Sequence, residues 1–413
     1  MTESLPLPKE VRPANQEVLN SLLRLEKWMV ENKYAAYDPF DGLDSPLAPY
    51  LTLDSVWLRM AWQQTVRRFP LNLRPWLGIK KAVSSKAMGF FAQGYLRLHQ
   101  TTGQEEYLDR MKFCLHWLLE HPTEGYSGYC WGNHFRVQSR GGYVPRFFPT
   151  IVWSGLIANA FLDAYEYLGE SRYAETAASV CKFIIEDLGW VERPEGICLR
   201  YYPKTDNLIH NSSLLGAALL ARVGLMLGDK SYGEVADRAM QFTVHHQRAD
   251  GAWYYGVEDK YRWIDSFHTG YNLEAIDTFE RCCGSGRYRS SLSKGYQFYL
   301  NTFFGPDGTP RYYELKTNPL DIQCASHGIQ ALVNLRALNP RSLETARKVA
   351  RWTIANMQDP SGYFYYRKYS LVTNKTPTLH WAQATMFASL ALLHQCESLR
   401  GAKPAGRLEK VHA

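Results

Sequence analysis

Apolar and polar positions along the chain repeat as one unit, six times over. Each unit has an aromatic stretch, a helix rich in small and apolar residues, a tight turn and a second helix. The aromatic stretches are residues 39–46, 128–135, 196–203, 250–256, 309–315 and 362–368. The first helix of each unit is expected to begin near Lys80, Thr150, Asn211, His268, Cys324 and His380. The last five of these positions are 56 to 61 residues apart, whereas the first interval is 70 residues.

Short polar turns join the two helices of a unit. Residues 102–109, 168–175, 227–234 and 283–290 each place a small residue, then polar residues, then Tyr, and residues 338–345 are a divergent copy. Corners this short force neighbouring helices to run antiparallel. With an opening helix at about 16–32, the second helices are expected to start near Gln16, Gln104, Ser171, Lys230, Gly286 and Ser342.

This period predicts stacked helical pairs, because one pair cannot bury its apolar face alone. Six pairs commonly close on themselves, so the sequence predicts an all-α fold, an (α/α)6 toroid of six helical hairpins in two concentric layers. Short aromatic, strand-like connections would lie on one rim. An open solenoid of the same pairs is the alternative. Since no linker interrupts the repeat, we expect a single toroid domain over residues 1–400 and a flexible tail over residues 401–413.

The connections within and between units differ in length, which predicts where function lies. Turns within a unit have about two to five residues, whereas connections between units have about 20 to 48. In a closed ring all the long connections lie at the rim where the inner helices begin. Helix N-termini present unpaired N–H groups and favour anions or electron-rich oxygens. We therefore expect a funnel at this rim.

Composition and charge exclude several classes of protein. The chain has 47 basic and 40 acidic residues and a net charge of +7, and the charges are dispersed except at Arg67-Arg68 and Lys80-Lys81. A nucleic-acid binder would show a basic stripe or a known module, so no nucleic-acid partner is expected. No run of apolar residues is long enough for a membrane-spanning helix, and no secretory signal is evident. The eight cysteines lack metal-ligand spacing, which is typical of reduced thiols in the cytoplasm.

The run from Trp263 to Asn272 is the densest polar group on the expected rim. Asp265 as N-cap and His268 at the third helical position would form a carboxylate and imidazole pair suited to proton transfer. The alternative is that Asp265 only caps the helix and His268 satisfies a buried polar group.

His327 and His380 occupy equivalent helix starts in the next two units, so three imidazoles could line one side of the funnel. Three histidines also raise the question of a metal. Because no carboxylate pattern accompanies them, the sequence predicts no metal site and no cofactor.

Glycoside hydrolysis usually needs two carboxylates that face each other. The first connection carries Asp38, Asp41 and Asp44, and Asp41 is the candidate catalytic carboxylate. The alternative is that these residues form ordinary Asx turns beside Gly and Pro. Since no pair of carboxylates stands out by its spacing, the hypothesis of a two-carboxylate hydrolase is weakened. A lyase or epimerase remains, in which His, Tyr or Lys moves a proton next to a uronic carboxylate.

Aromatic and amide side chains are concentrated on the same rim, where they could stack on sugar rings and donate hydrogen bonds. The alternative is that they belong to the core. The candidate substrate-binding residues are Trp131, Asn133, His134, Arg140, Tyr202, Asn211, Trp253, Tyr255, Tyr271 and Trp381.

Five stretches carry a resemblance to known proteins: residues 37–46 (YDPFDGLDSP), 202–206 (YPKTD), 211–217 (NSSLLGA), 250–256 (DGAWYYG) and 265–271 (DSFHTGY). Through them nearly the whole chain resembles the six-hairpin toroid superfamily of carbohydrate-active proteins. It is most similar to a bacterial and archaeal family labelled delta-aminolevulinic acid dehydratase or VpsJ-type polysaccharide biosynthesis protein. The dehydratase label does not suit an all-helical repeat, because that enzyme resembles a TIM barrel with a Schiff-base lysine. The resemblance implies a glycan context and no particular reaction.

Three functional hypotheses follow. The first is an enzyme that acts on a polysaccharide or glycan intermediate by hydrolase, lyase or epimerase chemistry. Its expected partner is an oligosaccharide or polysaccharide, and anionic glycans are among the candidates. The second is a non-catalytic glycan-binding or polysaccharide-assembly factor. The third is isoprenoid chemistry, but the DxDD and DDxxD motifs of that class do not occur. The sequence does not indicate the oligomeric state.

Overall fold

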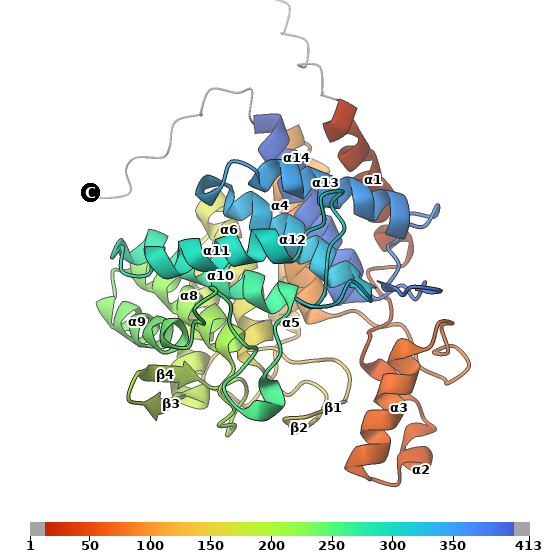
Figure 1. The fold of residues 1–413 in the computed structure, drawn as a ribbon, viewed down its shortest axis with the longest axis horizontal. Coiled ribbons are helices and arrows are strands. Elements are labelled where there is room, and N and C mark those ends of the chain that lie inside the picture. Colours follow the sequence, from red (N-terminus) through yellow and green to blue (C-terminus); the bar gives the residue numbers. More distant parts are fainter. Residues whose placement is uncertain (1–12, 400–413) are drawn as a thin grey trace, which may run out of the picture.

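The computed structural model describes residues 13–399, and two layers of helices dominate it (Figure 1). The inner helices are α4 (Ser85–Thr102), α6 (Ile151–Leu168), α8 (His210–Leu227), α10 (Ser266–Cys283), α12 (Ile322–Asn334) and α14 (Thr385–Leu399). The outer helices are α1 (Pro13–Glu31), α5 (Glu105–Glu120), α7 (Ser171–Lys182), α9 (Lys230–His245), α11 (Arg289–Thr302) and α13 (Ser342–Met357). Most of these starts lie within three residues of those predicted from the repeat, and α4 and α14 begin five residues later.

The inner helices form a closed ring, because each contacts the next and α14 contacts α4. Five outer helices pack against the inner helix that precedes them in the chain. The sixth hairpin is made by the two ends of the chain, since α1 packs against α14. The open solenoid is therefore wrong, and the predicted (α/α)6 toroid is confirmed. The expected tail, residues 401–413, lies outside the described residues.

Burial follows the two layers. The inner helix α8 is buried on nearly every side over its first four turns, as its run of Leu, Ala and Gly predicts. The outer helix α9 buries only a narrow stripe and leaves the rest partly or fully exposed. Four hairpin turns use a glycine as the helix C-cap, as at Gly169 and Gly228, where φ is 71° and 69°. This left-handed conformation is inexpensive for glycine and ends the helix sharply.

Only part of the aromatic stretches is true strand. The chain forms β1 (Val137–Ser139) with β2 (Gly142–Val144), and β3 (Trp190–Arg193) with β4 (Gly196–Leu199). A third small sheet joins β5 (Leu320–Asp321), β6 (Arg367–Lys368) and β7 (Thr373–Asn374). The other stretches are held by isolated bridges, such as Asp265 with Tyr313. Each of these bridges joins a single pair of residues, so these stretches do not pair along their length.

The first connection differs most from the sequence prediction. Two helices, α2 (Ala48–Thr52) and α3 (Val56–Arg68), project from the ring beside β1 and β2 (Figure 1). The repeat does not predict these helices, because they lie between the first aromatic stretch and the next expected helix and have no counterpart in the other units. Several of their apolar side chains face outward, so they do not share the inward period of the other units.

Candidate functional site

A pocket of about 880 Å³ opens where the inner helices begin. Residues at the starts of five inner segments line it. Thr150 and Ile209 precede α6 and α8, His268 lies in the first turn of α10, Gln323 in that of α12, and Trp381 in the π-helical turn before α14. The long connections supply the rest of the wall. The predicted funnel at this rim is therefore present.

Asp265 and His268 form the pair that the sequence suggested. Asp265 is the N-cap of α10, and its Oδ1 accepts the backbone N–H of His268 at 3.0 Å. The Nδ1 of His268 lies 2.7 Å from Oδ2 of the same carboxylate, which also accepts Trp263 Nε1 at 2.9 Å. Three hydrogen bonds fix the carboxylate, so it orients the imidazole and leaves Nε2 as the ring nitrogen available to a ligand.

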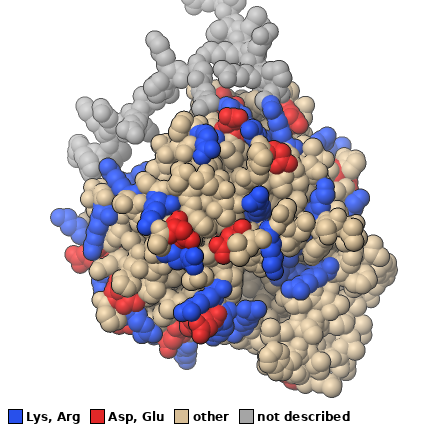
Figure 2. Space-filling view, viewed as in Figure 1, with Lys and Arg blue, Asp and Glu red and all other residues tan. Residues whose placement is uncertain are grey.

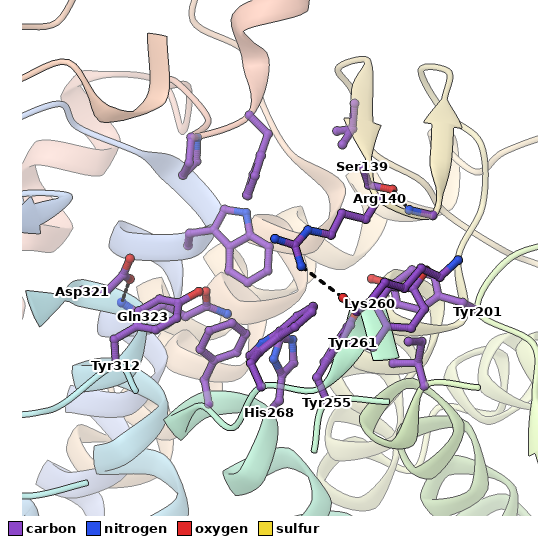
Figure 3. A pocket seen from close by; sticks show the side chains of 18 of the residues that line it. Ser139, Arg140, Tyr201, Tyr255, Lys260, Tyr261, His268, Tyr312, Asp321 and Gln323 are labelled. Atoms are coloured by element: carbon purple, nitrogen blue, oxygen red, sulfur yellow. Dashed lines mark hydrogen bonds between the residues drawn. The ribbon is translucent and has the colours of Figure 1, made fainter. Parts of the chain in front are cut away.

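Aromatic rings surround this imidazole on the pocket side (Figure 3). The ring centroids of Tyr255 and Phe267 lie 4.4 Å and 4.0 Å from that of His268, and Trp263 stacks on Tyr255 at 4.5 Å. Burial raises the pKa of Tyr255 well above its ordinary value, which keeps its hydroxyl protonated. The His268 side chain is 20% exposed, so it remains accessible within this apolar wall.

Basic side chains outnumber acidic ones in the pocket wall. The basic residues are Arg67, Arg68, Arg140, Lys260, Arg262 and Lys316, and the acidic residues are Asp259, Glu314 and Asp321. Arg140 donates from Nη1 to the Lys260 carbonyl at 3.1 Å, which holds its guanidinium across the pocket mouth (Figure 3). The excess of positive charge favours a ligand with negative groups.

Two of the three carboxylates in the pocket wall form ion pairs with arginines. Asp321 caps α12 and is ion-paired with Arg367, and Asp259 lies 3.0 Å from Arg262. The remaining carboxylate is Glu314, whose pKa is raised by partial burial. Among the described residues that line the pocket, no two carboxylates without an arginine partner therefore face each other.

A second carboxylate and imidazole pair lies beneath the pocket floor. His380 Nδ1 is 2.6 Å from Asp38 Oδ2, and both side chains are 0% exposed. The His380 ring packs against three rings that line the pocket, with centroids 4.9 Å from Trp153, 4.8 Å from Trp381 and 6.2 Å from Phe135. These rings separate His380 from the pocket, so the prediction that it lines the funnel is wrong.

Burial sets the charge state of this sealed cluster. It raises the pKa of Asp38 to about 7 and lowers that of His380 well below its ordinary value. It also lowers the pKa of Lys86 to about 7 and that of His134 to about 4. The Lys86 ammonium group lies 4.2 Å from the ring centre of Trp381, on the sealed side of the floor.

His327 is the third predicted imidazole, and it also lies outside the pocket lining. Its Nε2 is 2.8 Å from Glu274 Oε2, its side chain is 2% exposed, and its ring packs on Tyr271 at 3.9 Å. His327 is the sixth residue after the N-cap Asp321, whereas His268 is the third after Asp265. One further turn places His327 deeper in the ring, which sequence spacing alone did not show.

Asp41 is a structural residue rather than part of the pocket. It opens a 3-10 turn, accepts the Asp38 backbone N–H at 2.9 Å and pairs with Arg74 Nε at 2.7 and 3.0 Å. Burial raises the pKa of Asp41, and the Arg74 guanidinium opposes that shift. The alternative of ordinary turn residues therefore describes Asp41 best.

The candidate binding residues divide into two groups. Asn133, Arg140, Tyr202, Tyr255 and Trp381 line the pocket. The others do not line it: Trp131, His134, Asn211, Trp253 and Tyr271.

The two tryptophans that miss the pocket are core residues. Trp131 and Trp253 are 1% and 2% exposed, and their Nε1 groups donate to the carbonyls of Leu118 and Thr243 at the ends of outer helices. Each of these hydrogen bonds holds a connection against the outer helix that precedes it. The prediction that these two rings stack on sugar is wrong, because the aromatic stretches turn alternate side chains into the wall.

Several pocket residues were not predicted. Trp263 lies two positions before Asp265 in extended backbone, so the two side chains share one side, and this period of two was the available signal. Gln323 is the second residue after the N-cap Asp321, and His268 is the third after the N-cap Asp265, so both lie in the first turn of an inner helix. Arg67 and Arg68 come from α3, and the longer first interval of the repeat, 70 residues, was the available signal of this insertion.

Two further observations concern the described residues as a whole. Within residues 13–399, no three His, Cys, Asp or Glu side chains gather as metal ligands would. None of the helices described is both long and apolar enough to cross a bilayer.

Comparisons with known proteins establish the fold. A cellobiose 2-epimerase from Bacillus thermoamylovorans B4167 superposes with a TM-score of 0.57 and 10% identity, over 75% of this chain and 87% of that one. A glycosyl hydrolase family 88 protein from Bacteroides vulgatus gives 0.57 and 10%, over 94% and 99%. A possible GH105 family member from Salmonella enterica gives 0.60 and 11%, over 95% and 97%.

No family model matches the chain, and no curated protein matches its sequence. The similar solved structures thus show that this chain shares their fold, whereas the VpsJ-type and dehydratase labels have no support.

Proposed function

We propose that the protein is a carbohydrate-active enzyme that binds a glycan in the rim pocket and moves a proton with His268. The single observation that carries this proposal is the imidazole of His268, oriented by Asp265 and open to an aromatic pocket. Aromatic faces suit the C–H faces of sugar rings, and an imidazole held at Nδ1 by a carboxylate can accept or donate a proton at Nε2. The similar solved structures, which include an epimerase and glycoside hydrolases, support a sugar ligand.

Within this class, epimerase or lyase chemistry fits the pocket better than two-carboxylate hydrolysis. Hydrolysis by the usual route needs an acid and a base or nucleophile on opposite sides of the glycosidic bond. Asp259 and Asp321 are engaged by arginines, and Glu314 alone does not make such a pair. One imidazole acting as a base on a C–H group needs no second carboxylate.

The substrate is proposed to carry negative charge, such as a uronate group. Arg67 and Arg140 are planar guanidinium groups suited to a carboxylate, and they come from different connections on the pocket wall. A uronate carboxyl also makes the neighbouring C–H more acidic, so binding and chemistry would use the same group.

The test is proton exchange in heavy water. The protein is incubated with uronate-containing and neutral oligosaccharides in D₂O, and products are analysed by NMR and mass spectrometry. Deuterium at a sugar carbon supports proton abstraction with return of a solvent proton, as in an epimerase, and a new C=C double bond in a cleaved product supports proton abstraction followed by elimination, as in a lyase. Cleavage with neither deuterium on carbon nor a new double bond would show hydrolysis. Binding without any turnover of the whole panel would favour the non-catalytic glycan-binding alternative.

A further inference from the structure

The segment 47–76, which contains α2 and α3 and is here called the apolar lobe, exposes an unusual number of hydrophobic side chains. Of 23 large hydrophobic side chains exposed among the described residues, ten lie in these 30 residues. Their exposed fractions run from 41% to 78%, and they are Leu47, Tyr50, Leu51, Leu53, Val56, Trp57, Leu58, Phe69, Leu71 and Trp76.

The lobe buries little of its own apolar surface. On its inner side Val66 packs with Tyr37 and Ile79 in a small cluster separate from the main core. The three aromatic side chains Tyr50, Trp57 and Trp76 are each more than 70% exposed. Large apolar side chains exposed at this density mark an interaction surface on most folded proteins.

The shape and charge of the lobe indicate the kind of surface it meets. The lobe projects from the ring (Figure 1), and its visible face carries almost no charged side chain (Figure 2). In residues 47–81 the one acidic residue, Asp54, is paired with Arg59. The exposed basic residues Arg68, Lys80 and Lys81 flank the apolar side chains. The flank is therefore positive, and the tip is apolar and rich in aromatic rings.

We propose that the apolar lobe docks onto the surface of a bilayer that contains anionic lipids. Trp and Tyr prefer the level of the lipid headgroups, apolar side chains enter just below them, and nearby lysines and arginines attract anionic headgroups. A second copy of the chain suits the lobe less well. A two-fold contact would bring the same basic flanks together, and like charges oppose that contact.

Docking would also place the pocket beside the membrane. Arg67 and Arg68 end α3 and line the pocket, so the lobe and the pocket wall share a helix. The bilayer proposal itself does not depend on the proposed reaction, and its test uses no activity measurement.

The test is co-sedimentation of the full chain with vesicles. One set contains phosphatidylcholine alone, and the other contains about 30% phosphatidylserine, where each lysine near the surface is expected to add roughly fivefold to binding. The lobe variant is Trp57→Ala with Trp76→Ala. The charge variant is Lys80→Gln with Lys81→Gln, which leaves the pocket lining unchanged. The matched control is Leu225→Ala with Leu227→Ala, which removes two side chains 64% and 53% exposed at the opposite rim.

We expect the wild type and the control to bind the anionic vesicles. The lobe variant should lose at least about tenfold in binding, and the charge variant roughly 10- to 30-fold at low salt. Circular dichroism should show all variants folded, because the changed side chains lie at the surface.

Three results would overturn the proposal. The wild type does not bind anionic vesicles, or the lobe variant binds them as well as the control does. The third is a wild-type dimer in light scattering that the lobe variant abolishes, which would assign the lobe to a second copy of the chain.

Discussion

Two carboxylate and imidazole pairs lie close together in this molecule and differ in one respect. Asp265 and His268 are 2.7 Å apart, and Asp38 and His380 are 2.6 Å apart. The His268 side chain is 20% exposed in the pocket wall, whereas that of His380 is 0% exposed beneath the pocket floor. The two pairs therefore have nearly the same distance between imidazole and carboxylate but differ in their access to the pocket. Access to substrate, rather than the pairing itself, separates a candidate for proton transfer from a structural pair.

The position of each histidine explains the difference. His268 follows an N-cap in the first regular turn of α10, where side chains point to the rim. His380 lies in a π-helical turn, with the rings of Trp153 and Trp381 between it and the pocket. A π turn shifts the side chains that follow it relative to an α-helix, so equivalent sequence positions do not give equivalent directions.

The largest expected effect is on turnover. His268→Gln keeps the approximate size and hydrogen bonding of the side chain but cannot titrate, so the rate should fall by about 10²- to 10⁴-fold. Steady-state kinetics on the substrate identified in D₂O would measure it. The matched control is His116→Gln, since His116 also lies within 3.1 Å of a carboxylate, Glu120, but on the outer helix α5. Equal rates for the two folded variants would remove His268 from the reaction.

The next effect is on stability and concerns the sealed pair. Asp38→Ala leaves His380 and Lys86 buried without their carboxylate, and removing one partner of a buried pair costs about 3–5 kcal/mol in unfolding free energy. Asp265→Ala should cost about 0.5–2 kcal/mol, the value of a lost N-cap. Urea denaturation measures both. If Asp265→Ala lowered the unfolding free energy more than Asp38→Ala does, the open pair rather than the sealed pair would contribute more to stability, contrary to this prediction.

A third prediction concerns the pH dependence of stability and a buried histidine, His210, that has no carboxylate partner in the described structure. His210 is buried, with Nδ1 3.3 Å from Thr243 Oγ1, and burial together with the nearby His246 lowers its pKa from 6.5 to about 3. As the pH falls below 6.5 the unfolded chain binds a proton at this site and the folded chain does not, so stability is lost. The loss is about 1.4 kcal/mol for each pH unit between roughly pH 6.5 and pH 3.

The measurement is urea denaturation of the wild type and His210→Gln at pH 7, 6 and 5. The stability of the wild type relative to the variant should decline toward pH 5. A difference that stays constant with pH would show that the folded protein protonates His210 normally.

The smallest effect tests whether Asp265 has a role beyond capping. Asp265→Ser keeps a good N-cap, so the free energy of unfolding should change by less than about 1 kcal/mol. The serine is too short to hold the imidazole ring, and turnover should still fall. A variant with unchanged stability and unchanged turnover would reduce Asp265 to a capping residue.

Pattern and spacing predicted the fold more fully than the site. The glycine turns and apolar runs repeat with each hairpin, so the positions of helices such as α8 and α10 follow from the sequence. Asp265 and His268 were also predictable, because an N-cap and the third helical residue are local neighbours. The pocket role of Arg67 was not predictable, since α3 is an insertion that reaches the rim from outside the repeat.

The aromatic residues show the limit most clearly. Trp131, Trp253 and Trp381 all lie at the expected rim, yet only Trp381 faces the pocket. In curved, irregular connections the direction of a side chain depends on which helix packs behind it, and that helix can be far away in the sequence. The same reason separates His268 from His380.

The sequence by itself determined the six-hairpin ring, the rim that carries the pocket and the local pairing of Asp265 with His268, because these depend on period, turn length and helix capping. The tertiary structure alone decided which carboxylates are engaged by arginines, which imidazoles are sealed, and that an apolar lobe projects beside the pocket. Those properties depend on which distant segments bury each side chain, and the local sequence pattern does not indicate this.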